Sequence, residues 1–139
     1  MSRIFWDTNI YIYLFELHPE LSKPIQGMRQ RMLERGDQLM TSWLTIAEVQ
    51  IQPHKMGRLD LCERYKDSIQ RSSLLLPFGE QEADAFRTIR SMGITSADSI
   101  QLACASAAET DLFITNDKRL HNLRIPNINF ITSVDRIPF

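Results

Sequence analysis

The distribution of apolar residues along the chain predicts strands that alternate with helices. Short apolar runs typical of buried strands occur five times, at Ile4–Trp6, Leu39–Thr41, Leu74–Phe78, Leu112–Thr115 and Ile128–Ile131. Between these runs, apolar residues recur three or four positions apart, which predicts helices over residues 10–14, 18–36, 43–51, 57–71, 80–92, 97–110 and 118–123. Gly36 and Gly93 are suited to end helices, and we expect Pro53 to end the helix that begins at Trp43.

This alternation predicts a three-layer α/β/α fold, with a mostly parallel central sheet and helices on both of its faces. The chain of 139 residues is long enough for one domain with its own apolar core, so we expect a single domain over residues 1–139. In sheets of this kind, ligands bind beyond the carboxyl ends of the strands. Asp7 and Asp117 both follow predicted strands closely, which places a candidate site at that edge.

Composition adds few constraints on function. The formal net charge is −1, from 16 basic and 17 acidic residues, whereas a general nucleic-acid coat protein is usually strongly basic. The cysteines and histidines lack the spacing of metal ligands. We therefore interpret Cys62 and Cys104 as small buried hydrophobes. His18 is expected at a helix entrance, His54 in a loop after Pro53, and His121 on the last short helix.

Several other classes of protein are not indicated. The five glycines are isolated, so there is no glycine-rich phosphate loop, and no Ser-His-Asp or Cys-His arrangement is suggested. The apolar run at the N-terminus is too short for a signal peptide, and no stretch approaches the length of a membrane span. We expect a cytoplasmic protein without a membrane partner.

Four acidic residues are candidates for a site, although each also has a structural explanation. Asp7 is suited to cap the helix that follows it, and Glu48 is suited to form a capping box with Thr45. Asp98 is favoured in the first turn of its helix by the helix dipole, and Asp117 is suited to a turn. These readings remain open for each acid taken alone.

The helical register of two of these acids points to more than capping. Residues three and four apart share a helix face. Glu48 therefore shares its face with Leu44 and Ile51, and Asp98 shares its face with Leu102 and Ala105. We expect both stripes to face the interior, where an ionised acid is costly unless it is hydrogen-bonded, paired or coordinated to a metal.

If the sheet gathers these acids, their oxygen ligands suit Mg²⁺, with Mn²⁺ as a substitute. Clustered acids that hold divalent ions are a common arrangement for hydrolysis of phosphodiester bonds. The expected mechanism is in-line attack by a metal-activated water, without a covalent intermediate.

Four segments of the sequence resemble PIN domains, and among them the VapC-like toxins of bacterial and archaeal toxin–antitoxin pairs. The segments are Phe5-Trp6-Asp7-Thr8-Asn9, Ser42-x-x-Thr45-x-x-Glu48, Ala97-Asp98-Ser99-Ile100-Gln101-Leu102-Ala103 and Ile114-Thr115-Asn116-Asp117. Their order spans nearly the whole chain. The resemblance implies that Asp7, Glu48, Asp98 and Asp117 are catalytic and bind the metal.

The resemblance has further implications. Thr8, Asn9, Thr115 and Asn116 are expected to position the substrate, a water or a carboxylate. The family's properties imply an endoribonuclease that cleaves RNA, forms a homodimer and is silenced by an antitoxin protein. Lys118 and Arg119 follow the last acid; they are placed to touch RNA phosphate, although a solvated helix face is the favoured interpretation.

Other readings of the sequence compete with this one. A phospho-acceptor receiver domain expects an acidic pair near the N-terminus, where this chain has only Asp7. A dehalogenase-type phosphatase needs a second aspartate two residues later, where Asn9 stands. A non-catalytic PIN-like module that binds RNA or protein is the main alternative, because a fold can persist without its chemistry. An RNA-processing nuclease without an antitoxin is another.

Overall fold

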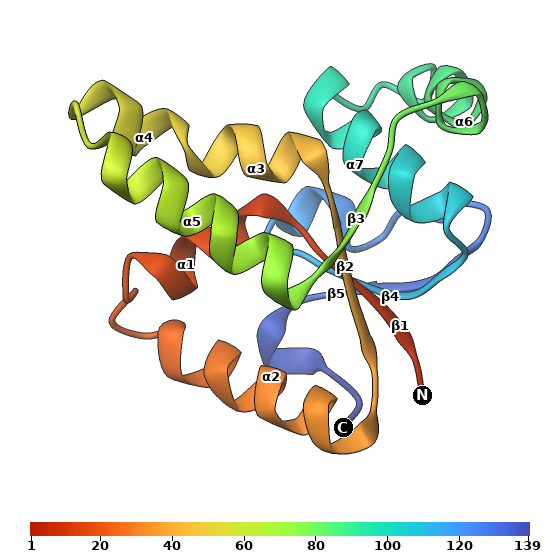
Figure 1. The fold of residues 1–139 in the computed structure, drawn as a ribbon. Coiled ribbons are helices and arrows are strands. Elements are labelled where there is room, and N and C mark those ends of the chain that lie inside the picture. The colour runs from red at the N-terminus through yellow and green to blue at the C-terminus, as the bar shows by residue number, and fades with distance from the viewer.

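A five-stranded sheet forms the centre of the computed structural model, which describes residues 1–139 (Figure 1). The strands are β1 (Arg3–Trp6), β2 (Gln38–Ser42), β3 (Leu74–Leu76), β4 (Thr110–Ile114) and β5 (Ile128–Thr132). They lie in the order β3-β2-β1-β4-β5, and every neighbouring pair is parallel. The predicted α/β class is therefore confirmed, with a sheet that is parallel throughout.

Helices cover both faces of this sheet and complete the three predicted layers (Figure 1). They are α1 (Thr8–Phe15), α2 (Ser22–Arg35), α3 (Trp43–Val49), α4 (Ile51–Lys55), α5 (Leu59–Ser72), α6 (Glu80–Arg90) and α7 (Ser96–Ala107), with short 3₁₀ helices η1 (Lys118–Leu120) and η2 (Val134–Arg136). One apolar core joins the sheet to α1, α2, α3 and α5. A second core joins its other face to α6 and α7.

The order of the strands determines where a ligand can bind. The chain builds β2 and β3 on one side of β1, and then returns to add β4 and β5 on the other side. The connections at the carboxyl ends of β1 and β4 consequently diverge, which is the position where open parallel sheets form a crevice. The two strand ends are held together there, because the backbone N–H of Asp7 donates to the carbonyl oxygen of Ile114 at 2.9 Å.

The strand at the centre of the sheet is buried on both faces, as its continuous apolar sequence requires. Ile4, Phe5 and Trp6 are each at most 1% exposed. The rings of Phe5 and Phe113 stack with centroids 4.9 Å apart. At the sheet edge the prediction was wrong in part, because Leu74 is exposed and the strand ends at Leu76. Strand β3 has only one neighbour, so its first residue has nothing to cover it.

Two predicted helix boundaries were also wrong. Pro53 does not end the helical region, since it lies inside α4 and His54 follows it in that helix rather than in a loop. The chain divides at Gln50, so Pro53 falls in the first turn of α4, where a missing N–H breaks no helical hydrogen bond. Helix α7 ends at Ala107 instead of residue 110, because Glu109 has a φ of 57° and Thr110 already belongs to β4.

The predicted helix end at Gly36 is confirmed, since this residue caps α2 with a φ of 74°, a conformation that favours glycine. Helix α6 ends at Arg90, two residues earlier than predicted, and Gly93 lies with a φ of 88° in the turn that follows. No helix of the structure has the length and apolar character that a membrane span requires.

From the stacking of Phe5 on Phe113 we predict how strongly the stability of the core depends on its aromatic residues. Phe113→Ala should destabilise the fold by about 3–5 kcal/mol, because the cavity it leaves between β4 and α7 cannot collapse fully. Phe130→Ala is the matched control, since that ring is 68% exposed and its loss should change stability little. Urea denaturation followed by circular dichroism measures both variants; equal stabilities would contradict this account of the core.

Candidate functional site

The four predicted acids reach one cavity from four separate segments. Asp7 follows β1, Glu48 lies on α3, Asp98 lies in the first turn of α7, and Asp117 follows β4. The cavity has a volume of about 210 Å³ and is lined by Asp7, Thr8, Asn9, Ile12, Glu48, Ala97, Asp98, Gln101 and Asp117. We call it the acid cavity. It lies at the carboxyl ends of β1 and β4, where the topology places the crevice.

Asp7 is the most deeply buried of the four acids, with only 6% of its surface exposed. Its Oδ1 accepts from the N–H of Thr8 at 2.9 Å, and its Oδ2 accepts from the hydroxyl of Thr115 at 2.7 Å. Burial raises the pKa of Asp7 to about 6; these two hydrogen bonds lower it, and the nearby charges of Asp98 and Glu48 raise it further. Asp7 thus caps α1 and also faces other acids.

Glu48 is half-buried and faces Thr8 across the acid cavity. Its Oε1 accepts from the Thr8 hydroxyl at 2.7 Å. No capping box forms, because α3 begins after Ser42 and not at Thr45. The expectation that the Glu48 stripe faces the interior was wrong at Ile51, which is 51% exposed. The helix face that carries Glu48 and Ile51 therefore turns toward the acid cavity and the solvent where α3 passes into α4.

Gln101 fixes the walls of the acid cavity relative to one another. Its Nε2 donates to the hydroxyls of Thr8 at 3.0 Å and Thr45 at 2.8 Å, and its Oε1 accepts from the hydroxyl of Ser42. Gln101 is only 2% exposed. It therefore ties α7 to α1 and to the start of α3. The sequence prediction gave it no role, although a glutamine three residues after Asp98 on an otherwise apolar helix was a usable signal.

Asp117 is held by a cation that was also not predicted at the site. Arg119 donates to Oδ1 of Asp117 through Nε at 3.0 Å and to Oδ2 through Nη2 at 2.7 Å. These hydrogen bonds lower the pKa of Asp117. The same Nη2 lies 3.9 Å from Oδ2 of Asp98. Arg119 is 74% exposed, as expected of a solvated residue, but it pairs with two of the four acids.

The predicted positioning residues occupy two layers. Thr8 and Asn9 line the acid cavity, whereas Thr115 and Asn116 lie behind it. Asn9 joins the two layers: its Nδ2 donates to the Thr115 hydroxyl at 3.4 Å, and its Oδ1 accepts from the N–H of Asn116 at 3.3 Å. This arrangement fixes the turn after β4 against the start of α1. The assigned roles in substrate or water positioning stay predictions.

The donors of the acid cavity suit a hard divalent ion, because they are carboxylate, hydroxyl and amide oxygens without thiol or imidazole. No three acidic side chains, however, stand in the arrangement that one ion requires. Two of the acids are engaged by Arg119 instead. The residues thus fit a metal by their chemistry, and Asp117 would have to leave its ion pair to join the others.

The remaining candidate ligands lie elsewhere. Cys62 and Cys104 are buried free thiols outside the acid cavity, as their helical positions predicted. His18 caps the segment before α2, where its Nδ1 accepts from the N–H groups of Glu20 and Leu21. Nε2 of His121 lies 2.8 Å from the carbonyl oxygen of Thr115.

The burial of Asp7 predicts a pH-dependent effect on stability. Because its pKa is about 6 in the folded protein and ordinarily 3.8, the folded state binds this proton more tightly. The contribution of Asp7 to stability is therefore complete at low pH and is lost as the pH rises through about 6, at a cost of roughly 3 kcal/mol near neutrality. Asp7→Asn keeps one oxygen that accepts from the N–H of Thr8, while its amide nitrogen has to donate to the Thr115 hydroxyl instead of accepting from it. Because it removes the buried charge, it should be the more stable protein at neutral pH in EDTA.

Thermal denaturation across the pH range from about 4 to about 8 measures this difference. The advantage of Asp7→Asn should shrink toward the acid end of the range. Asp67→Asn, a change on the exposed surface of α5, is the control and should show no such trend. A variant that is less stable than the wild type at every pH would contradict the assignment of a buried, repelled carboxylate.

The chain matches known proteins in sequence and in fold. A family model described as PIN domain matches residues 4–126. No curated protein sequence matches the chain. The fold is similar to VapBC2 from Rickettsia felis, solved with a DNA fragment from its promoter, with a TM-score of 0.76 and 18% identity over 94% of this chain and 98% of that one.

Two further solved structures share this fold. DNA-bound VapBC from Salmonella typhimurium matches with a TM-score of 0.74 and 21% identity over 96% of this chain and 99% of that one. A toxin–antitoxin complex from Klebsiella pneumoniae matches with a TM-score of 0.65 and 21% identity over 90% of this chain and 94% of that one. With the family match spanning residues 4–126, the chain belongs to the PIN-domain family.

Proposed function

We propose that the protein is a metal-dependent endoribonuclease and that the acid cavity is its active site. The observation that carries this proposal is the meeting of four acids from distant segments in one cavity of a PIN domain, a family of nucleases. Nothing in the core of the fold requires these charges to lie together. Their mutual repulsion has to be offset, and a cation with an anionic substrate is the simplest combination that offsets it.

Asp7, Glu48, Asp98 and Asp117 are the residues that would hold Mg²⁺ or Mn²⁺. Such an ion supplies a water of lowered pKa and neutralises the charge of the phosphate. Asp7 carries a proton at mildly acidic pH and must lose it to serve as a ligand. Metal binding should therefore release this proton, so the affinity of the site for the ion should rise with pH up to about 6.

The surrounding residues orient these carboxylates. The Thr115 hydroxyl fixes Oδ2 of Asp7, and the Thr8 hydroxyl fixes Oε1 of Glu48. Gln101 holds Thr8 in turn, so both acids are fixed by groups that are themselves buried. Rigid supports of this kind keep ligands near a productive geometry at little entropic cost. Asn9 is the polar side chain best placed to contact the substrate, since it lines the acid cavity beside Asp7.

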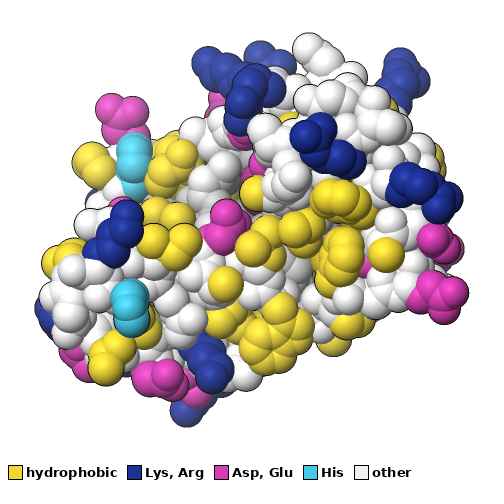
Figure 2. Space-filling model, turned by 90° about the horizontal axis from the view of Figure 1, so that it is seen from above, with side chains coloured by type: hydrophobic (Ala, Val, Ile, Leu, Met, Phe, Trp, Pro, Cys, Tyr) yellow, Lys and Arg dark blue, Asp and Glu magenta, His cyan; other side chains and the backbone are white.

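We further propose that the protein is the toxin of a toxin–antitoxin pair, and that it forms a homodimer in the cytoplasm. The VapBC structures with this fold support the pairing. Figure 2 looks onto the carboxyl ends of the strands and shows hydrophobic side chains gathered across that face. Trp43 on α3, Ile51 on α4, Phe78 before α6 and Met92 after it are large apolar residues that are about half exposed. We take this exposed apolar surface as the face for protein contact.

A cleavage assay tests the nuclease. The wild type should cleave a mixed pool of single-stranded RNA in Mg²⁺ or Mn²⁺ and lose this activity in EDTA. Asp7→Asn and Asp98→Asn should each reduce cleavage by at least a hundredfold, because each removes a ligand and a negative charge from the acid cavity. Asp67→Asn on α5 is the control for a conservative change outside the cavity and should cleave normally.

Each other outcome has a defined meaning. Cleavage that persists in EDTA or in both cavity variants would refute the proposed site. A folded wild type that binds RNA and never cleaves it would favour the non-catalytic module. Cleavage in vitro without growth arrest on expression in cells would favour an RNA-processing nuclease that has no antitoxin.

The ion pair at Asp117 predicts an effect on metal affinity. Arg119→Gln frees Asp117 and removes a positive charge next to Asp98, so Mn²⁺ should bind about two- to fivefold more tightly by isothermal titration calorimetry. Arg71→Gln on α5, which breaks a surface ion pair with Asp67, should leave the affinity unchanged. Weaker binding in Arg119→Gln would show that Arg119 holds Asp117 in its ligand position.

A further inference from the structure

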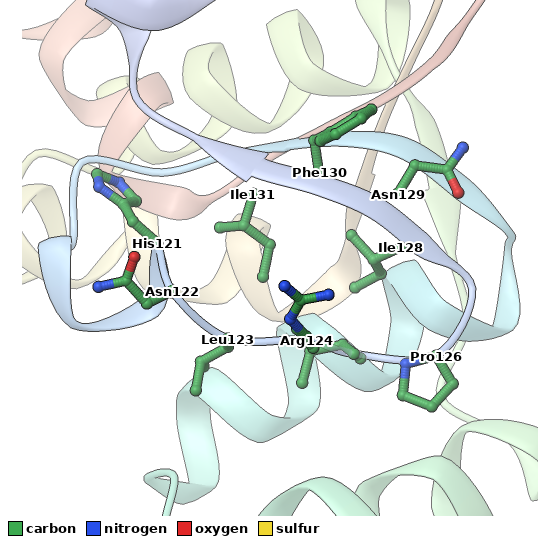
Figure 3. A pocket seen from close by; sticks show the side chains of 10 residues that line it. His121, Asn122, Leu123, Arg124, Pro126, Ile128, Asn129, Phe130 and Ile131 are labelled. Atoms are coloured by element: carbon green, nitrogen blue, oxygen red, sulfur yellow. The ribbon is translucent and has the colours of Figure 1, made fainter.

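A second cavity lies along the free edge of the sheet. It has a volume of about 620 Å³, between strand β5 and the segment from His121 to Pro126 that precedes it (Figure 3). In Figure 3, Ile128 and Ile131 point from β5 toward Arg124 and the connecting segment, while the ring of Phe130 stands on the opposite side of the strand. We call this cavity the β5 groove.

The β5 groove exists because the connection from β4 to β5 lacks a full helix. Other parallel strands of the sheet are joined through α-helices of 5 to 14 residues, whereas η1 has only 3 residues. Leu120 and Ile125 anchor the connection in the core, where each is at most 4% exposed. The rest of the segment runs along the edge of β5 and leaves the space that a crossover helix would occupy.

The lining of the β5 groove has an unusual charge for this chain. Its ten lining residues include one basic residue, Arg124, and no acidic residue, although acids outnumber bases in the chain as a whole. Arg124 is exposed and makes no ion pair. The amide of Asn129 donates to Oδ1 of Asp111, the nearest acid that touches the lining. A free guanidinium without a competing acid suits an anionic occupant.

A third cavity lies between the β5 groove and the acid cavity, because it shares Leu123 with the former and Asp98 with the latter. His121 forms one end of the lining of the β5 groove, and its Nε2 contacts the carbonyl oxygen of Thr115 at 2.8 Å. Thr115 donates in turn to Asp7. Asp117, which lines the acid cavity, lies four residues before His121. A polymer with one phosphate at the acids can therefore extend along η1 into the β5 groove.

We propose that the β5 groove binds the single-stranded RNA that flanks the scissile phosphate; this inference rests on the proposed nuclease function. The acids repel a polyanion, so most of the favourable charge contacts must lie outside the acid cavity. Arg124 supplies such a contact to phosphate. Phe130 is 68% exposed and its ring stands on the other side of the same edge strand, so RNA that crosses the edge of β5 from Arg124 can stack a base on it. This pairing of cation and aromatic ring is typical of single-strand binding.

RNA binding can be measured apart from cleavage. The assay is fluorescence anisotropy of a fluorescein-labelled single-stranded oligoribonucleotide, with the cleavage-deficient Asp7→Asn protein in EDTA. Adding Arg124→Ala should weaken binding about fivefold and reduce its salt dependence by about one counterion. Adding Phe130→Ala should weaken binding about tenfold with the salt dependence unchanged. Both side chains are exposed, so melting temperatures should stay at that of the parent.

Matched controls separate the groove from general surface effects. Arg64→Ala removes an exposed arginine from α5, and Leu33→Ala removes an apolar side chain that is 57% exposed on α2. Neither residue lines the β5 groove. Both variants should bind RNA as the parent does. A duplex of the same sequence should bind more weakly than the single strand, because its bases are not free to stack on Phe130.

The outcomes distinguish this proposal from the nuclease proposal. If both groove variants bind RNA as tightly as the parent, or the parent binds no RNA at low salt, the β5 groove is not an RNA site. If they lose RNA affinity while the wild type cleaves no RNA with any divalent ion, the groove is supported and the nuclease function is wrong. If RNA affinity is unchanged while a co-expressed protein partner is lost, the groove binds protein instead.

Discussion

Asp7 is confined where two strands of the sheet meet, and the chemistry of the site depends on this confinement. Its backbone is hydrogen-bonded to the end of β4, and its side chain, only 6% exposed, is held in place by Thr8 and Thr115. The carboxylate is therefore held in a poorly solvated position beside Glu48 and Asp98. Hydrogen bonds from Thr8 and Thr115 compensate only in part. Such a site favours whatever brings a proton or a cation to it.

The polar network around Gln101 explains how acids that are distant in sequence reach one cavity. One buried side chain bonds to hydroxyls that belong to α1, α3 and the end of β2. A glutamine can satisfy several partners at once, whereas an apolar residue would leave buried hydroxyls without partners. Helix α7 is thereby held in register with both neighbours. The position of Asp98 follows from this network as much as from the apolar contacts of α7 with the sheet.

The sequence was sufficient for the fold class because the strands are continuous apolar runs and the helices keep a clear period. It failed at Pro53, which was expected to end a helix but is tolerated in the first turn of α4. It also failed at Thr110, because the positive φ of the preceding Glu109 ends α7 earlier than predicted. It indicated that Asp7 and Asp117 share one edge, since both follow strands. The ion pair of Arg119 with Asp98 was beyond it, because that contact depends on packing between segments that no local pattern records.

The short connection between β4 and β5 separates two properties that are usually linked, namely the chemistry of the acids and the preference for a ligand. The acids depend on the central strands and on helices packed against both faces, so a change there alters the whole core. The segment from His121 to Asn127 lies outside the sheet and is attached through buried Ile125 and a few hydrogen bonds, such as that from the Ser106 hydroxyl to the carbonyl oxygen of Pro126. Insertions and substitutions in this segment therefore cost little free energy of folding. A protein built in this way can acquire a new preference for its ligand while its chemistry stays fixed.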